Sequence, residues 1–239
     1  MNKPIHFFRS AGFSIAAIFA TVSIFVSCSK NSQTNTSTPE ALVMAFNLAP
    51  DKAAVGFSIS GSNLTTAALQ YANFTGNYLS TSPGDKTVQA YDFGSSSSII
   101  ASTVFTFKKD DYHSIFLVGK GAHYQNLIVD DNIGTLSASS GLAYIRYVHA
   151  IPDSTSPLQV TVTNTSGNLL SDAVPFPFVS SFKGVTPGNI TIDITNGSSI
   201  VLSKTFTVEQ KTVYTILLTG VPNSTSTPLQ INRITNGNL

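Results

Sequence analysis

Apolar and polar residues alternate along most of the chain after residue 40, in short runs that end at Pro-Gly, Asn-Gly or serine-rich segments. Val55, Phe57 and Ile59 alternate with glycine and serine, and isoleucines alternate with threonine and aspartate from Ile190 to Thr195. A strand covered on one face buries every second side chain, so this period of two predicts β-strands. Because no useful run with the 3.6-residue period of a helix follows residue 28, we expect an all-β protein.

The pattern of the chain occurs twice. Val43–Asp51 matches Ile145–Asp153 at a spacing of 102 residues, and His113–Gly119 matches Tyr214–Gly220 at a spacing of 101. Landmarks that recur in the same order indicate a tandem duplication. We therefore predict two antiparallel β-sandwiches of immunoglobulin-like architecture. The predicted segments are a signal peptide (1–27), a flexible tether (28–40), a first sandwich (41–132), a linker (133–141) and a second sandwich (142–239).

The duplication also predicts which side chains lie inside each sandwich. Equivalent alternate positions should point into the two cores, namely Val55, Phe57, Ile59, Leu158, Val160 and Val162. The intervening Ser58, Thr161 and Thr163 should face solvent or the rim. We expect the two sandwiches to unfold independently, so Phe57→Ala should lower the melting temperature of the first one alone and give two separable unfolding steps in calorimetry.

The first 27 residues have the layout of a secretion signal. Lys3 and Arg9 precede an apolar run over residues 11–26. Cys28, the only cysteine, follows this run. The run is shorter than the about 20 residues of a membrane-spanning helix and typical of a signal peptide. The segment ending at Cys28 resembles a bacterial lipobox, which implies cleavage before Cys28 and lipid attachment to its sulfur. An uncleaved signal anchor and secretion with a free thiol are the alternatives.

Residues 29–39 contain only polar residues and one proline, which is typical of a flexible tether. Ser29, rather than aspartate, follows the cysteine. By resemblance to bacterial lipoproteins, this favours the outer membrane over retention in the inner membrane.

Composition narrows the classes of function. Only 10% of the residues are charged, the formal net charge is +1, and 32 serines and 27 threonines supply most of the polar surface. A nucleic-acid-binding protein would carry a basic patch, so this class is not expected. A single cysteine excludes a disulfide scaffold and a cysteine-rich zinc site.

The second half of the chain carries a distinctive group of motifs: Ile145–Asp153, which ends in His-Ala-Ile-Pro-Asp, the turn Thr186-Pro187-Gly188, and Tyr214–Gly220. These motifs resemble the domain of unknown function numbered 4397, a family of bacterial secreted and surface proteins. The first half is degenerate, with Asn47 in place of the histidine and His113 in place of the tyrosine. The resemblance implies a β-sandwich outside the cytoplasm and brings no activity and no catalytic residue.

His149 and Asp153 are the pair on which a hydrolytic site would rest, because a catalytic triad needs a nucleophile, a base and an orienting acid. No Gly-x-Ser-x-Gly elbow accompanies them. We therefore favour a structural His149 that forms a hydrogen bond within its own turn. We expect His113 to be a half-buried strand residue and His123 to be a solvated loop residue.

No metal or cofactor is expected from the sequence. The carboxylate clusters, Asp110-Asp111 and Asp130-Asp131, lack the Asp-x-Asp-x-Asp spacing of a calcium loop. We expect the first of them to form a solvated turn.

Aromatic residues without a counterpart in the other half are candidates for a binding surface: Tyr71, Tyr91 and Tyr124, to which we add His149 and Asp153. Asp153-Ser154-Thr155 resembles the O-glycosylation acceptor of Bacteroidota, with Ser154 as the modified residue.

Together these features favour a non-catalytic lipoprotein of the bacterial cell envelope, anchored in the outer membrane through Cys28. Its tandem sandwiches would serve adhesion, ligand binding or surface assembly, with a glycan or an envelope protein as partner. The alternative is an envelope hydrolase that acts on glycans or peptides through the region of His149 and Asp153.

Overall fold

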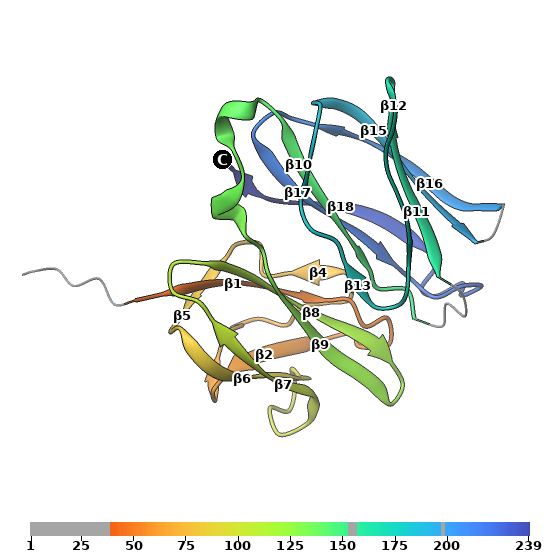
Figure 1. Cartoon of the computed structure of the whole chain (residues 1–239). Coiled ribbons are helices and arrows are strands. Elements are labelled where there is room, and N and C mark those ends of the chain that lie inside the picture. Colours follow the sequence, from red (N-terminus) through yellow and green to blue (C-terminus); the bar gives the residue numbers. More distant parts are fainter. Residues whose placement is uncertain (1–38, 153–156, 197–198) are drawn as a thin grey trace, which may run out of the picture. The chain divides into compact units, whose positions relative to one another are not determined.

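The structure is a computed structural model of the chain, and it describes residues 39–152, 157–196 and 199–239 (Figure 1). These residues form 18 β-strands, and their only helical segments are two short 3₁₀ turns, η1 (Ile133–Thr135) and η2 (Ala138–Ser140). Both turns lie in the predicted linker. The all-β prediction is therefore confirmed, as two tandem pairs of sheets.

The first repeat consists of two facing sheets. One has the strand order β4-β1-β8-β9, with β5 also paired to β1, and the other has the order β3-β2-β6-β7. The strands are β1 (Ala41–Asn47), β2 (Val55–Ile59), β3 (Ser62–Asn63), β4 (Asn73–Phe74), β5 (Leu79–Thr81), β6 (Gly84–Asp92), β7 (Ile99–Phe107), β8 (Tyr112–Lys120) and β9 (His123–Asp130).

The second repeat has the same topology, strand for strand. Its sheets have the orders β13-β10-β17-β18, with β14 also paired to β10, and β12-β11-β15-β16. The strands are β10 (Ala143–His149), β11 (Leu158–Asn164), β12 (Gly167–Val174), β13 (Phe178–Val179), β14 (Lys183–Val185), β15 (Gly188–Asn196), β16 (Ser199–Val208), β17 (Thr212–Thr219) and β18 (Gln230–Asn238). This correspondence supports the duplication.

One pairing in each repeat differs from the antiparallel expectation. β1 runs parallel to β8, with Val43 opposite His113, and β10 runs parallel to β17, with Ile145 opposite Tyr214. Parallel neighbours need a long crossover connection. Here the connection includes the whole opposite sheet: the chain leaves β1, builds β2 and β3, adds the short strands β4 and β5 beside β1, and forms β6 and β7 before it returns as β8.

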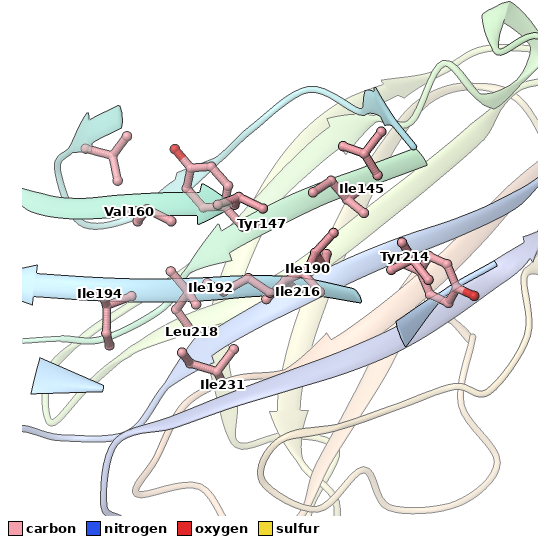
Figure 2. Close-up of a cluster of buried hydrophobic side chains, with 14 of the residues drawn as sticks. Ile145, Tyr147, Val160, Ile190, Ile192, Ile194, Tyr214, Ile216, Leu218 and Ile231 are labelled. Carbon is pink, nitrogen blue, oxygen red and sulfur yellow. The ribbon is translucent and has the colours of Figure 1, made fainter. Parts of the chain in front are cut away.

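Each repeat encloses its own hydrophobic core, and Figure 2 shows the core of the second repeat with its isoleucines on facing strands. All six side chains predicted to point inward are buried, from Val55 to Val162. The prediction for Ser58 is wrong, because this residue is also buried. It lies in the central strand β2, opposite Asn63 of β3 and Gln89 of β6, so neighbours flank it on both sides. Thr161 and Thr163 are half-buried.

A third buried cluster is shared by the two repeats. It contains Met44, Phe46, Leu48, Phe116 and Val118 from the first repeat, and Val148, Ala150 and Leu217 from the second. These side chains lie on the faces of β1, β8, β10 and β17 that point away from the repeats' own cores. Both faces of these strands are therefore covered, which explains why the strands are buried along almost their whole length and contain apolar runs on consecutive residues.

Residues 38–239 accordingly form one compact unit. The expectation of two independently unfolding sandwiches finds no support in this shared cluster. Truncating a core residue of one repeat should therefore lower the stability of both repeats.

Candidate functional site

His149, the histidine of the family motif, ends β10 with its ring fully buried. The backbone N–H of Ile151 donates to its Nδ1 at 3.4 Å, and Phe176 meets the ring edge-on. This confirms the predicted hydrogen bond within the turn. Burial disfavours the charged imidazolium and lowers the pKa of His149 to about 4.

Asn47 occupies the equivalent position at the end of β1. Its side-chain oxygen accepts from the N–H of Ala49 at 3.2 Å, and its amide nitrogen donates to the carbonyls of Lys52 and Leu69. The two repeats therefore fix the same turn, one with an amide and the other with an imidazole.

His113 is fully buried rather than half-buried, which corrects the prediction. The N–H of Lys108 donates to its Nε2 at 3.2 Å, so Nδ1 carries the proton that Asp130 accepts at 3.0 Å. In the second repeat the N–H of Glu209 donates to the hydroxyl of Tyr214 at 3.1 Å. His113 thus takes the place that Tyr214 has in the second repeat, as the acceptor for the preceding turn.

His113 and Asp130 resemble the base and acid of a triad, and their surroundings oppose that role. A general base needs a free nitrogen within reach of the proton that it removes. Nε2 of His113 already accepts a backbone N–H, the ring packs against Phe105 and Phe107, and Asp130 is also paired with Lys108.

Asp51, in the Pro-Asp turn of the first repeat, connects this turn by hydrogen bonds to the segment around Gly121 and Tyr124. Its Oδ2 accepts from the N–H of Gly121 at 2.8 Å and from the hydroxyl of Tyr124 at 2.7 Å. Partial burial opposes ionisation of Asp51, but these hydrogen bonds outweigh it and lower the pKa of the carboxyl. Burial and the nearby Asp51 carboxylate raise the pKa of Tyr124 to about 12. Lys52 lies over the Tyr124 ring at 5.3 Å from its centre.

The other candidate tyrosines lie inside. Tyr91 is only 4% exposed, and its ring covers Gly56, where a Cβ would come within 2.4 Å of the ring. The hydroxyl of Tyr71 is buried beside Thr219 and Gly220 of the second repeat. The structure therefore places Tyr91 in the packing of its own repeat and Tyr71 at the junction between repeats, rather than on one open platform.

His123 is exposed as predicted, although it begins strand β9 instead of lying in a loop. Asp110 lies in the turn between β7 and β8 with φ of 59°, which agrees with the prediction of a turn. Cys28, Asp153 and Ser154 are outside the described residues, so the predictions made for them are unchanged.

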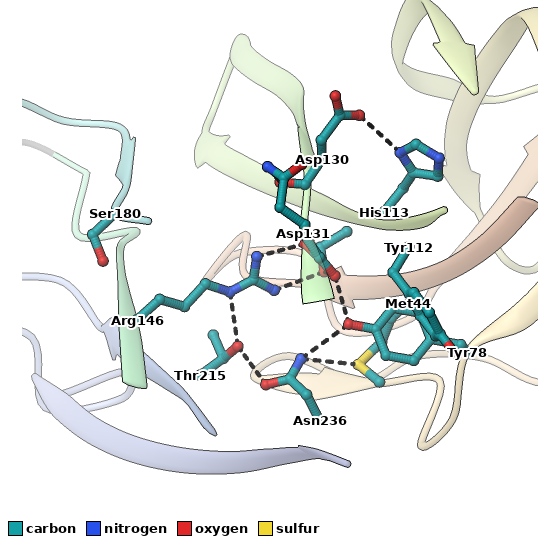
Figure 3. A network of polar contacts seen from close by, with 12 residues as sticks. Met44, Tyr78, Tyr112, His113, Asp130, Asp131, Arg146, Ser180, Thr215 and Asn236 are labelled. Atoms are coloured by element: carbon teal, nitrogen blue, oxygen red, sulfur yellow. Dashed lines mark hydrogen bonds and ion pairs between the residues drawn. The ribbon is translucent and has the colours of Figure 1, made fainter. Parts of the chain in front are cut away.

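The most elaborate polar arrangement was not predicted, and it joins the two repeats (Figure 3). Arg146 of β10 is buried and donates from Nη1 to Asp131 at 2.5 Å, from Nη2 to Ser114 at 2.8 Å, and from Nε to Thr215 at 2.9 Å. Its guanidinium lies 4.4 Å from the ring centre of Phe182.

Further hydrogen bonds close this arrangement into a ring. Tyr78 donates to Asp131 at 2.5 Å, Asn236 donates to Tyr78 at 3.4 Å, and Thr215 donates to Asn236 at 2.7 Å. Burial, and then the Asp131 carboxylate, strongly raise the pKa of the Tyr78 hydroxyl. The junction network is defined by six residues: Tyr78, Ser114, Asp131, Arg146, Thr215 and Asn236.

Members of the junction network come from equivalent positions of the duplication. Ser114 corresponds to Thr215, and Asp131 corresponds to Asn236, because each follows the residue paired with His113 or Tyr214. Arg146 corresponds to Met44 at the motif spacing of 102 residues. The sequence signal for the site is a single arginine in the middle of the otherwise apolar run from Ala143 to Val148.

A cavity of about 370 Å³ adjoins the junction network. The end of β9, the linker and the segment 179–182 line it, and both Asp131 and Arg146 reach its wall. Polar side chains of both repeats line this partly open cavity.

Within the described ranges, no group of three or more His, Cys, Asp or Glu side chains is arranged to hold a metal ion. None of the helices there is long and apolar enough to cross a bilayer.

Fold and site define a class: a tandem β-sandwich protein whose two repeats share a buried polar junction. A family model described as Domain of unknown function (DUF4397) matches residues 41–142 and again residues 143–237. The chain therefore belongs to this family, in two tandem copies, as its motifs predicted. A comparison with curated proteins gave no match.

Proposed function

We propose that the chain is a non-catalytic lipoprotein of the bacterial cell envelope, anchored in the outer membrane through Cys28. Its two repeats serve as one rigid module for adhesion, ligand binding or surface assembly. A glycan or an envelope protein is the expected partner.

The pair His149 and Asn47 carries the non-catalytic part of this proposal. A catalytic histidine needs an accessible ring nitrogen and a pKa near the working pH. The ring of His149 is buried with a pKa of about 4, and an amide without acid–base chemistry makes the same turn hydrogen bond in the first repeat. This weighs against the alternative of an envelope hydrolase built on His149 and Asp153.

The anchoring part rests on the sequence. The apolar run over residues 11–26 is followed by the only cysteine and then by a polar tether. Two or more acyl chains on one cysteine give stable membrane attachment, because each buried CH₂ contributes about 0.8 kcal/mol.

Metabolic labelling with a radioactive fatty acid tests the anchor. We expect label on the wild type, none on Cys28→Ala, and loss of the variant from the membrane fraction or retention of its signal peptide. Cys28→Ser, which changes the shape of the side chain least, should also remain without label. Absence of label from the wild type would refute the lipoprotein assignment.

Envelope extracts test the role in binding or assembly. The purified chain should retain a defined glycan or protein, whereas release of product from envelope glycans or peptides, abolished in His149→Asn, would favour the hydrolase instead.

A further inference from the structure

The cavity at the junction of the repeats has the size of a small-ligand site. Its volume of about 370 Å³ lies within the range of roughly 300–1,000 Å³ that is usual for ligand pockets. Both repeats and the linker contribute to its wall, so it exists only in the assembled pair. Figure 3 shows Arg146 reaching from the strand near Ser180 toward Asp131.

The wall offers hydrogen-bond donors and acceptors side by side. A guanidinium has five N–H groups, and the three bonds of Arg146 in the described part of the chain use three of them. A carboxylate accepts about four hydrogen bonds, and Asp131 accepts three. Asn132 and Ser181, both exposed at the rim, add an amide and a hydroxyl. Groups that both donate and accept, such as sugar hydroxyls, match this mixture.

The charges of the wall favour a neutral ligand. Asp131 is paired with Arg146, and Asp130 is paired with Lys108 and bonded to His113. Each carboxylate therefore already has a cationic partner, so the wall leaves no charge that a charged ligand could neutralise. Any added charge would also be buried without a partner, which costs free energy.

Apolar side chains complete the lining, namely Val129, Leu136, Val179 and Phe182. A pyranose ring presents C–H groups on its faces and hydroxyls at its edge. Apolar walls with a few placed polar groups are the usual composition of small-molecule sites.

We propose that this cavity binds one neutral pyranoside, such as the terminal sugar of an envelope glycan. This inference rests on the proposed non-catalytic binding role and names its ligand class. The sugar would contact both repeats at once, through Asn132 at the end of the first repeat and Ser181 of the second repeat.

Titration of the full chain, purified in detergent, with neutral methyl glycosides tests the proposal. The probes are methyl α-D-glucopyranoside, methyl β-D-galactopyranoside, methyl α-D-mannopyranoside and methyl N-acetyl-β-D-glucosaminide. At least one should bind with a Kd of about 10 mM or tighter in saturation-transfer NMR or calorimetry. Glucuronate and glucosamine, which carry a charge, should bind at least about tenfold more weakly.

Three variants locate the binding. Ser181→Trp, at an exposed position on the rim, should abolish binding by filling the cavity. Asn132→Gly should weaken it about tenfold or more while keeping the backbone, because Asn132 has φ of 50°, which glycine adopts readily. Asn223→Gly is the matched control, since Asn223 has φ of 61° and lies outside the cavity lining, and it should leave Kd unchanged.

Failure of all four glycosides to bind the wild type would overturn the proposal, as would binding that survives both Ser181→Trp and Asn132→Gly. Neither result would affect membrane attachment through Cys28 or capture of an envelope protein. The failure of this inference is therefore separable from a failure of the proposed function.

Discussion

The ring of His149 and the amide of Asn47 perform the same task at the same place in the two repeats. Each accepts the backbone N–H of the second residue after it, at 3.4 Å and 3.2 Å respectively. The two groups differ in acid–base chemistry, because only the imidazole can take up a proton in this pH range.

That difference predicts an acid-dependent loss of stability. In the unfolded chain His149 titrates near pH 6.5, whereas in the folded protein its pKa is about 4. Between these values the unfolded state binds the proton and the folded state does not, so the free energy of unfolding falls as the pH decreases from 6.5 to 4. At about 1.4 kcal/mol per pKa unit, the loss approaches about 3 kcal/mol.

His149→Asn should remove this part of the pH dependence, as measured by urea unfolding at a series of pH values between 4 and 7. His123→Asn, at an exposed histidine, is the control and should leave the slope of the wild type. The explanation fails if His149→Asn and the wild type lose stability in parallel.

The junction network predicts strong coupling between Arg146 and Asp131. Arg146→Met, which installs the residue of the equivalent position 44, leaves the Asp131 carboxylate buried without its counter-ion. Asp131→Asn leaves the Arg146 guanidinium buried without its counter-ion. Each change should cost about 3–5 kcal/mol. The double variant removes both charges and should cost much less than the sum, in a double-mutant cycle measured by denaturant unfolding. Additive losses would show that the ion pair does not hold the junction.

The shared cluster predicts that the two repeats unfold together. Phe57 is fully buried in the core of the first repeat, and its truncation to alanine should cost about 2–5 kcal/mol. Because Met44, Phe46 and Phe116 pack with Val148 and Leu217, the whole transition in calorimetry should shift to lower temperature. A transition of the second repeat that stays at the wild-type temperature would contradict this expectation.

The contact of Tyr91 with Gly56 predicts a compensating pair. Gly56→Ala places a methyl group within 2.4 Å of the ring and should destabilise the protein by about 1–3 kcal/mol. Tyr91→Ala removes the obstacle, so Gly56→Ala should cost little in that background. Gly94→Ala, where no atom lies within 4 Å of the added methyl, is the control. An equal cost of Gly56→Ala in both backgrounds would exclude the clash as its cause.

The fold could be predicted because its signals are local. The alternation at Val55, Phe57 and Ile59 indicates a strand with one buried face. The recurrence of the region around His-Ala-x-Pro-Asp indicates the duplication. The parallel pairing of β1 with β8 is not local, since it depends on where the chain returns after crossing to the opposite sheet.

The junction could be predicted only in part. Uninterrupted apolar runs such as Ile115–Val118 signal strands covered on both faces, and they could have indicated the shared cluster. Nothing in the spacing of Tyr78, Asp131 and Asn236 indicates that these residues meet at Arg146. Their meeting depends on how one repeat packs against the other, which periodicity does not encode.

The unequal distribution of charge within the junction network has a consequence for assembly. The first repeat supplies Asp131 where the second has Asn236, and the second supplies Arg146 where the first has Met44. Two copies of the first repeat joined in this way would bury a carboxylate against methionine, and two copies of the second would bury an arginine against asparagine. Only the unlike pair is electrically neutral, so the charges favour pairing of each repeat with its covalent neighbour over pairing with a copy of itself.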